Sequence, residues 1–133
     1  MFLSRNAVYL IVFAALNGLI AVITGSLAAH GIEDIAPVGE QAISWFYDGS
    51  DFQMKMAFGI ILVALLHDRV EEGRPRKLML ATGVLFGVGI LCFSGALYSL
   101  SFNGPGILAP FGGLAGMLGF ICLAIGAISS GAK

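Results

Sequence analysis

The sequence has few charged residues: Lys and Arg number 7 and Asp and Glu number 8 in 133 residues, together 11%. Soluble domains carry about 25% charged residues, so this chain cannot cover a water-facing surface of its own. The net charge of −1 leaves no cluster of cations large enough for a phosphate backbone. We therefore expect a chain that is partly surrounded by lipid and has no nucleic-acid partner.

Cysteine and histidine are also rare, with 2 residues of each. Both cysteines, Cys92 and Cys122, lie in apolar segments, and the sequence has no Cys-x-x-Cys pair or Cys and His cluster. Buried cysteine usually acts as an inert, small hydrophobic residue. We expect both cysteines to pack, and we expect neither a metal ion nor another cofactor.

Motifs of known enzyme chemistry are missing as well. The sequence contains no Gly-x-Ser-x-Gly, P-loop or His-Glu-x-x-His pattern. Gly112 and Gly113 lie in an apolar segment with no strand before it, so they do not form a phosphate-binding loop. The sequence thus predicts a protein without enzymatic activity, and a membrane enzyme is the least favoured function.

Hydrophobic residues, by contrast, make up 58% of the chain. Four stretches, about 7–29, 52–67, 78–100 and 108–129, approach the roughly 20 apolar residues that a helix needs to cross a bilayer. The sequence predicts an all-α fold, an integral membrane four-helix bundle with a single transmembrane domain over residues 1–133. The second stretch is the shortest, and a full span there must include Lys55, whose amine can extend to the interface.

The first stretch also resembles a secretory signal peptide, because Ser26-Leu27-Ala28 is an acceptable cleavage site. Its apolar part is longer than the usual region of about 7–15 residues. We expect it to be retained as a helix.

Acidic and basic residues are concentrated in different connections between the apolar stretches. Residues 30–51 are acidic and carry no Lys or Arg, whereas residues 67–77 carry four cations, and Arg5 and Lys133 lie near the ends. Cations concentrate on the cytoplasmic side of membrane proteins. Four crossings put these cations on one side, so we predict that both termini are cytoplasmic.

The connections contain further signals. Gln41–Tyr47 holds three aromatic residues of the kind that prefer an interface, which predicts a short helix on the outer surface. We expect that helix to break near Asp48–Ser50. Gly104–Gly106 indicates a turn, and Pro110 fits the first turn of the last helix, where no N–H is needed.

Small residues recur on one face of three stretches. Such faces let helices approach closely in lipid, and they predict a tight left-handed bundle. The residues are Ala14, Gly18, Ala21, Gly25 and Ala28 in the first stretch, Gly83, Gly87 and Ser94 in the third, and Gly112, Gly116, Gly119, Cys122 and Gly126 in the last.

Two polar residues stand out within or beside the spans. Asn17 is either a structural amide that bonds across the bundle, which we favour, or a ligand contact at the middle of the membrane. Thr24 lies seven residues later on the same helix face. His30 is either an interfacial cation or a proton-binding or metal-binding group facing Glu33 or Asp34. His67, among charged residues, is expected to be solvated.

These features favour a non-catalytic accessory or structural subunit that packs against other membrane helices or lipids, or against its own copies. The alternative is a small homo-oligomeric transporter or channel. Its polar track would run through Asn17, Thr24 and Ser94, with His30 or Lys55 at the outer mouth.

Several short segments resemble the transmembrane protein 256 family, also called domain of unknown function 423. They fall in order along nearly the whole chain. The family is one of small four-helix proteins of the bacterial inner (plasma) membrane or, less favoured here, the mitochondrial inner membrane, and it has no established activity. Family members usually carry a histidine just after the Gln-Met pair of the second helix, where this chain has Lys55-Met56-Ala57, so a shared two-histidine site is not expected. The segments are Asn17-Gly18, Gly25–Gly31, Phe52-Gln53-Met54, Phe93–Tyr98 and Pro110–Gly113.

Overall fold

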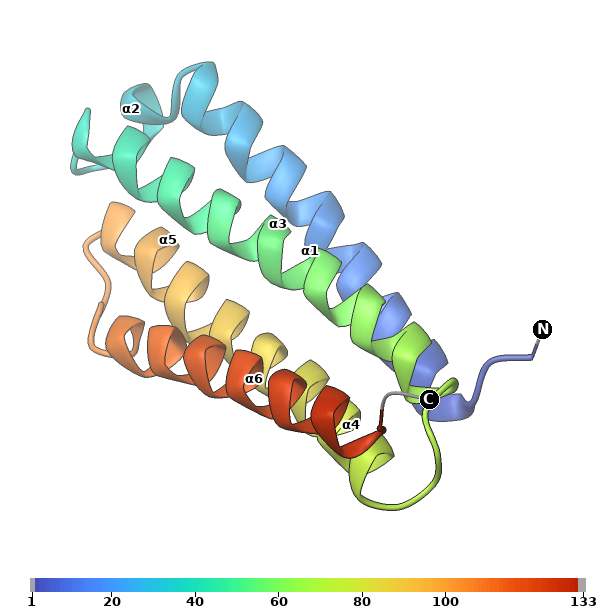
Figure 1. Cartoon of the computed structure of the whole chain (residues 1–133). Coiled ribbons are helices and arrows are strands. Elements are labelled where there is room, and N and C mark those ends of the chain that lie inside the picture. The colour runs from blue at the N-terminus through green and yellow to red at the C-terminus, as the bar shows by residue number, and fades with distance from the viewer. Residues whose placement is uncertain (1, 132–133) are drawn as a thin grey trace.

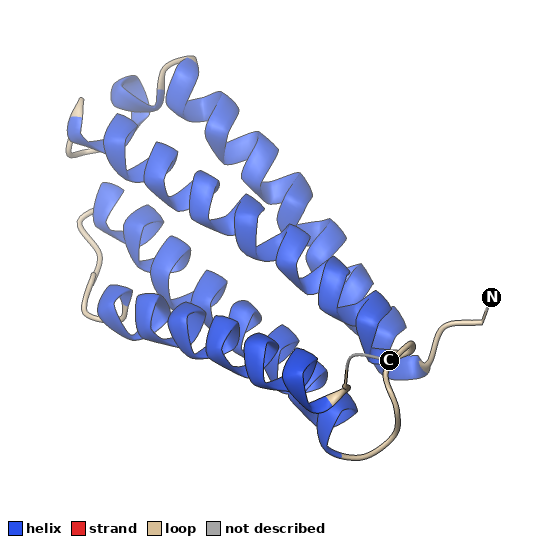
Figure 2. Cartoon of the chain, viewed as in Figure 1, coloured by secondary structure: helices blue, strands red, loops and turns tan. Residues whose placement is uncertain are grey.

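The computed structural model describes residues 2–131, and within them every regular element is a helix (Figures 1 and 2). Four helices are long and apolar enough to cross a membrane, as the sequence predicted. The third of these helices, Arg74–Ser101, is a continuous span made of two α-helical segments with a π-helical turn between them. The elements are α1 (Arg5–Ala29), α2 (Ile32–Ile35), α3 (Gln41–His67), α4 (Arg74–Gly89), the π-helical turn η1 (Ile90–Ser94), α5 (Gly95–Ser101) and α6 (Ala109–Ser129).

The four spans alternate in direction, so Arg5, the 68–73 loop and Ser129 lie at one end and α2 lies at the other (Figure 1). The α3 helix and the α4–η1–α5 helix form the central pair, because each contacts the other along most of its length. The α1 helix packs mainly on α3, and α6 packs on α4 and η1. The flanking helices α1 and α6 are consequently the least buried of the four.

The expected helix break near Asp48–Ser50 is wrong, because α3 runs without interruption from Gln41. Gly49 serves a packing role there, since a Cβ at this position would lie 2.7 Å from Cε1 of Tyr98. The hydroxyl of Ser50 donates to the carbonyl of Tyr47 and so remains compatible with the helix. The only short helix of the described first connection is α2, which precedes the aromatic segment.

The first turns of α3 are partly covered by the rest of the chain. Ala42 and Phe46 are buried in a cluster with Ala28 and Ile32, and the ring of Tyr98 packs on it. The Phe46 and Tyr98 ring centroids are 4.9 Å apart. This apolar cap holds the α2 end of α1 against α3 and α5.

The predicted small-residue faces are confirmed most clearly on α6. Its glycines at 112, 116, 119 and 126 are buried. A Cβ on Gly112 would lie 2.8 Å from Cα of Phe93 and closer still to its amide nitrogen, which leaves α6 no room to retreat from η1. On α1 the buried members are Ala14, Ala21 and Ala28. A Cβ on Gly18 would have nothing within 4 Å, so this glycine makes no such contact.

Pro110 lies in the first turn of α6, as expected. The end of α4, just before η1, also lies against this end of α6, because the carbonyl of Gly112 would be 3.2 Å from a Cβ on Gly89. Both cysteines are free and partly buried, consistent with a packing role.

Candidate functional site

The most connected polar group within the spans is a cluster of Asn17, Thr24, Gln53 and Tyr98, hereafter the polar cluster. Gln53 donates from Nε2 to Oδ1 of Asn17 at 2.9 Å. Tyr98 donates its hydroxyl to Oε1 of Gln53 at 2.8 Å. The Thr24 hydroxyl lies 3.0 Å from that of Tyr98. The cluster thereby joins α1, α3 and α5.

The helices supply these positions by simple periodicity. Asn17 lies at the middle of α1 and Thr24 lies seven residues, or about two turns, further along the same face. The spare amide of Asn17 donates from Nδ2 to the carbonyl of Phe13 at 2.9 Å. Gln53 is only 3% exposed. Because the amides bond to each other and to the main chain, their burial is compensated.

The hypothesis that Asn17 bonds across the bundle is confirmed, and its partner is Gln53. Gln53 and Tyr98 were not singled out from the sequence, although both occur in segments that carry the family resemblance. The signal in the sequence was the uncharged amide of Asn17 inside an apolar stretch, because a buried amide needs a hydrogen-bond partner.

The remaining residues of the expected polar track lie elsewhere. Ser94 is buried and donates to the carbonyl of Gly49 at 2.7 Å, where it ties η1 to α3. Lys55 is exposed and pairs with Asp51 at 2.5 Å. His30 is exposed at the end of α1. The structure therefore joins Asn17 to Thr24 but brings neither Lys55 nor His30 to them.

The expectation that His67 is solvated is wrong, because it is only 5% exposed. Its Nδ1 lies 2.8 Å from Oδ1 of Asp68, and the amide nitrogen of Ser4 donates to Oδ2 of Asp68 at 2.7 Å. The Ser4 hydroxyl, then the Ser4 amide, and to a smaller extent His67 lower the pKa of Asp68 from 3.8 to about 2, against partial burial. These contacts fasten the start of α1 to the end of α3.

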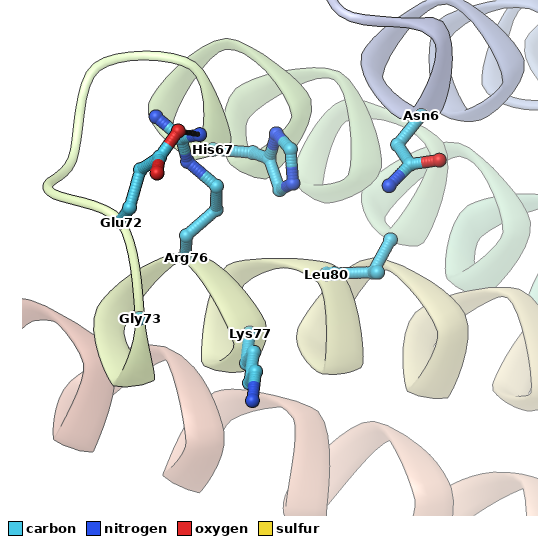
Figure 3. A pocket seen from close by; sticks show the side chains of 7 residues that line it. All are labelled: Asn6, His67, Glu72, Gly73, Arg76, Lys77 and Leu80. Carbon is cyan, nitrogen blue, oxygen red and sulfur yellow. Dashed lines mark hydrogen bonds and ion pairs between the residues drawn. The ribbon is translucent and has the colours of Figure 1, made fainter.

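A pocket of about 300 Å³ opens beside His67 at this end of the molecule (Figure 3). Arg76 donates to Glu72 at 2.8 Å and to the carbonyl of Val70 at 3.3 Å. Its Nε is buried and has no hydrogen-bond partner among the described atoms. The pocket is lined by Asn6, His67, Glu72, Gly73, Arg76, Lys77 and Leu80.

Among residues 2–131, no group of three or more His, Cys, Asp and Glu side chains lies close enough to hold a metal ion. His30, Glu33 and Asp34 are near one another in sequence but do not form such a group. The candidate chemistry of the described chain therefore rests on hydrogen bonding in the polar cluster and on cations around the pocket.

Comparison with known proteins identifies the family. The model of the protein family of unknown function DUF423 matches residues 24–113. A UPF0382 membrane protein of Haemophilus influenzae is 33% identical over 119 residues, which cover 87% of this chain and 90% of that protein. The chain belongs to this family. No solved structure matches it.

Two further relatives are also UPF0382 membrane proteins. The UPF0382 membrane protein YwdK of Bacillus subtilis is 32% identical, covering 89% of this chain and 94% of that protein. The UPF0382 inner membrane protein YgdD of Escherichia coli K12 is 27% identical, covering 90% and 89%. With four membrane-capable helices, the chain is a multi-pass protein of the bacterial inner membrane.

The matched DUF423 region includes Thr24, Gln53, Ser94 and Tyr98. Met56 stands where the resemblance implies a histidine, and it is buried in the core beside Ala14, Ile60 and Phe86. This member of the family therefore fills the position with an apolar side chain, which leaves the α1–α3 contact without a titratable group at that point.

Proposed function

We propose that this DUF423 protein is a non-catalytic accessory subunit that packs against other helices in the membrane. The observation that carries the proposal is that the buried polar side chains of the spans form hydrogen bonds within the protein itself. Asn17, Gln53 and Tyr98 bond to one another, and Ser94 bonds to the main chain of α3. These groups are engaged in holding the protein's own helices together, and intramembrane polar groups that act on a substrate have to be available to it.

The outer faces supply the second part of the proposal. Large apolar side chains cover the side of α6 that faces away from α4, including Leu114, Met117 and Ile121. The buried glycines of α6, at 112, 116, 119 and 126, are already used inside the molecule. A partner would therefore pack on a surface of large side chains, and bilayer lipids or a second copy would cover the remainder.

The test is blue-native electrophoresis of membranes solubilised in a mild detergent. The chain is expected to migrate in a particle that contains at least one other membrane protein or several copies of itself. Migration as a lone monomer under conditions that preserve known complexes of the same membrane would contradict the proposal.

The alternative is a small homo-oligomeric transporter or channel. One observation favours it: the polar cluster extends from the middle of α1 at Asn17 toward the α2 end at Thr24. A flux assay in liposomes that compares the wild type with Asn17→Leu separates the two functions. A flux above that of protein-free liposomes, which falls in the variant, supports transport. Background leakage with both proteins rules transport out.

We also propose that the Arg5 end faces the cytoplasm. Arg5, Arg69, Arg74, Arg76 and Lys77 lie at that end, whereas Glu33 and Asp34 lie at the other. A single cysteine introduced at Asp34 in a cysteine-free background should react with an impermeant reagent in intact spheroplasts. Reaction only after membrane permeabilisation would overturn this orientation.

A further inference from the structure

Two pockets follow one another along the seam between α1 and α4. The first is the polar pocket beside His67, which reaches Asn6 on α1 and Leu80 on α4. The second is an apolar groove of about 270 Å³, which begins one turn deeper at Leu10 and Gly83. Residues four apart lie on the same helix face, so Asn6 and Leu10 place the two pockets one after the other along the seam, although they share no lining residue.

The seam exists because α1 and α4 touch only slightly. At the glycines of α4 the side chains of α1 come close: a Cβ at Gly83 would lie 3.0 Å from Cδ1 of Leu10, and one at Gly87 would lie 3.3 Å from the ring of Phe13. Val88 and Leu91 complete the groove and remain largely exposed. Leu10 and Phe13 of α1 thus form one wall of the groove, and the side chains of α4 and η1 form the other.

The dimensions of this seam match one leaflet of a bilayer. From Gly83 to Leu91 the groove follows the α4–η1 helix for about 12 Å, at 1.5 Å per residue. Half of the hydrocarbon core of a bilayer is about 15 Å thick. The groove is therefore long enough to hold most of an acyl chain within one leaflet, and the polar pocket, one turn nearer the end of the helices, would then lie toward the headgroups.

The polar pocket offers donors for a phosphate. Figure 3 shows the Arg76 side chain rising from α4 toward His67, with Asn6 across the pocket on α1. The Nε of Arg76 is buried without a partner, which leaves an N–H that an acceptor entering the pocket could satisfy. Lys77 adds a second cation at the edge of the pocket, although in Figure 3 its side chain extends away from that of Arg76. Arginine donors and a lysine charge are the groups that bind phosphate in proteins.

We propose that this seam binds one anionic phospholipid, with its phosphate at Arg76 and Lys77 and one acyl chain in the groove from Leu10 to Leu91. A free phosphate would use only the polar pocket and would leave the groove unexplained. Glu72 opposes the ligand, because its carboxylate occupies the guanidinium of Arg76. The inference stands independently of the accessory role proposed above.

The test uses the full-length protein in nanodiscs that contain equal amounts of phosphatidylglycerol and phosphatidylcholine, followed by native mass spectrometry of the lipids that the protein retains. The wild type should retain one phosphatidylglycerol in clear preference to phosphatidylcholine. Arg76→Gln and Lys77→Gln should each reduce that preference about fivefold, the equivalent of about 1 kcal/mol for one cation at an anionic surface. Equal retention of both lipids by the wild type would overturn the proposal.

Matched variants separate binding from general damage. Glu72→Gln should raise the preference, because it removes a negative charge and releases Arg76, and a lost contact that merely weakened the fold would lower it. Arg74→Gln, at an exposed cation outside the pocket, should leave the preference unchanged. A loss of preference in Arg74→Gln as large as that in Arg76→Gln would assign the effect to net charge and contradict a defined site.

The groove has its own pair of variants. Val88→Trp should fill the groove and displace the lipid, whereas Leu114→Trp on the outer face of α6 should retain it. Circular dichroism and size-exclusion chromatography check that both variants fold. Retention of phosphatidylglycerol by a folded Val88→Trp, or its displacement by millimolar inorganic phosphate, would show that no acyl chain uses the groove and would overturn the lipid as the ligand.

Discussion

Gln53 is the residue through which α1, α3 and α5 are joined inside the bundle. Its amide nitrogen donates to Asn17 and its amide oxygen accepts from Tyr98, so a single side chain serves two helices. Interhelical hydrogen bonds in membranes contribute modestly, about 0.6 kcal/mol on average and up to about 1.7. Burial of an unpaired donor or acceptor adds to the cost when such a bond is lost.

Gln53→Met keeps the length of the side chain and removes both bonds. We expect it to lower the free energy of unfolding in detergent by about 1–2 kcal/mol, because Asn17 and Tyr98 each lose a partner. Ser26→Ala, at an exposed position on α1, is the control and should be neutral. An unfolding titration of the three proteins measures the difference, and equal stability of Gln53→Met and wild type would show that the cluster does not hold the helices together.

Asp68 is the second residue whose contacts join separate helices. Its pKa of about 2 in the folded protein lies below the ordinary 3.8, because Ser4 and His67 stabilise the carboxylate. A lowered folded-state pKa contributes stability that is present above pH of about 4 and is lost as the pH falls toward 2.

The thermal stability of the wild type should therefore decrease between pH of about 4 and 2 more steeply than that of Asp68→Asn. Melting temperatures measured across this range test the expectation. Asp34→Asn, at an exposed carboxylate of the opposite end, is the control and should follow the wild type. The same acid dependence in wild type and Asp68→Asn would rule out the Ser4–Asp68 contact as its source.

At the scale of the elements, the contact between α6 and η1 leaves no room for a side chain at Gly112. Gly112 lies against the backbone of Phe93, which cannot move aside as a flexible side chain would. Gly113, the next residue, has nothing within 4 Å of a Cβ position. A methyl group at Gly112 would therefore clash with the backbone of Phe93, whereas one at the adjacent Gly113 would meet nothing.

Gly112→Ala should destabilise the protein by about 2 kcal/mol or more, since α6 has to move away from η1. Gly113→Ala should be neutral or up to about 1 kcal/mol more stable, because alanine favours the helix. Comparing the two unfolding curves in one detergent tests the pair. If both substitutions had the same effect, the close contact would be absent.

The sequence predicted the spans well but not all of their limits. Length and hydropathy predicted α1, α6 and the third span, and the small residues of α6 indicated their packing face. The start of α3 could not be predicted, because Asp48, Gly49 and Ser50 have a loop-like composition. Only the ring of Tyr98, far away in the sequence, shows why a glycine is needed there.

The candidate sites show the same limit at the level of side chains. Asn17 was recognisable as a polar residue that needs a partner, but its partner depends on the register between α1 and α3. His67 follows an apolar helix and precedes charged residues, a pattern typical of a solvated position. It is buried because the start of α1 folds over it, and Ser4 is 63 residues away in the sequence.

At the scale of the whole molecule, Asn17, Gln53 and Tyr98 bond to one another inside the bundle, while α1 and α6 present apolar faces. We propose that the protein acts through those faces, by packing against other membrane helices. The functional residues of such an accessory subunit lie on its outer surface, whereas those of a transporter would lie in the polar cluster.

The most direct measurement is photo-crosslinking in native membranes from single positions on α6. Met117 is 61% exposed on the outer face, whereas Ala115 is 7% exposed and faces inward. We expect a discrete adduct with a membrane protein, or with a second copy, from a crosslinker at Met117 and none from one at Ala115. The absence of any protein adduct from Met117 and from the exposed Leu19 on α1 would contradict the account.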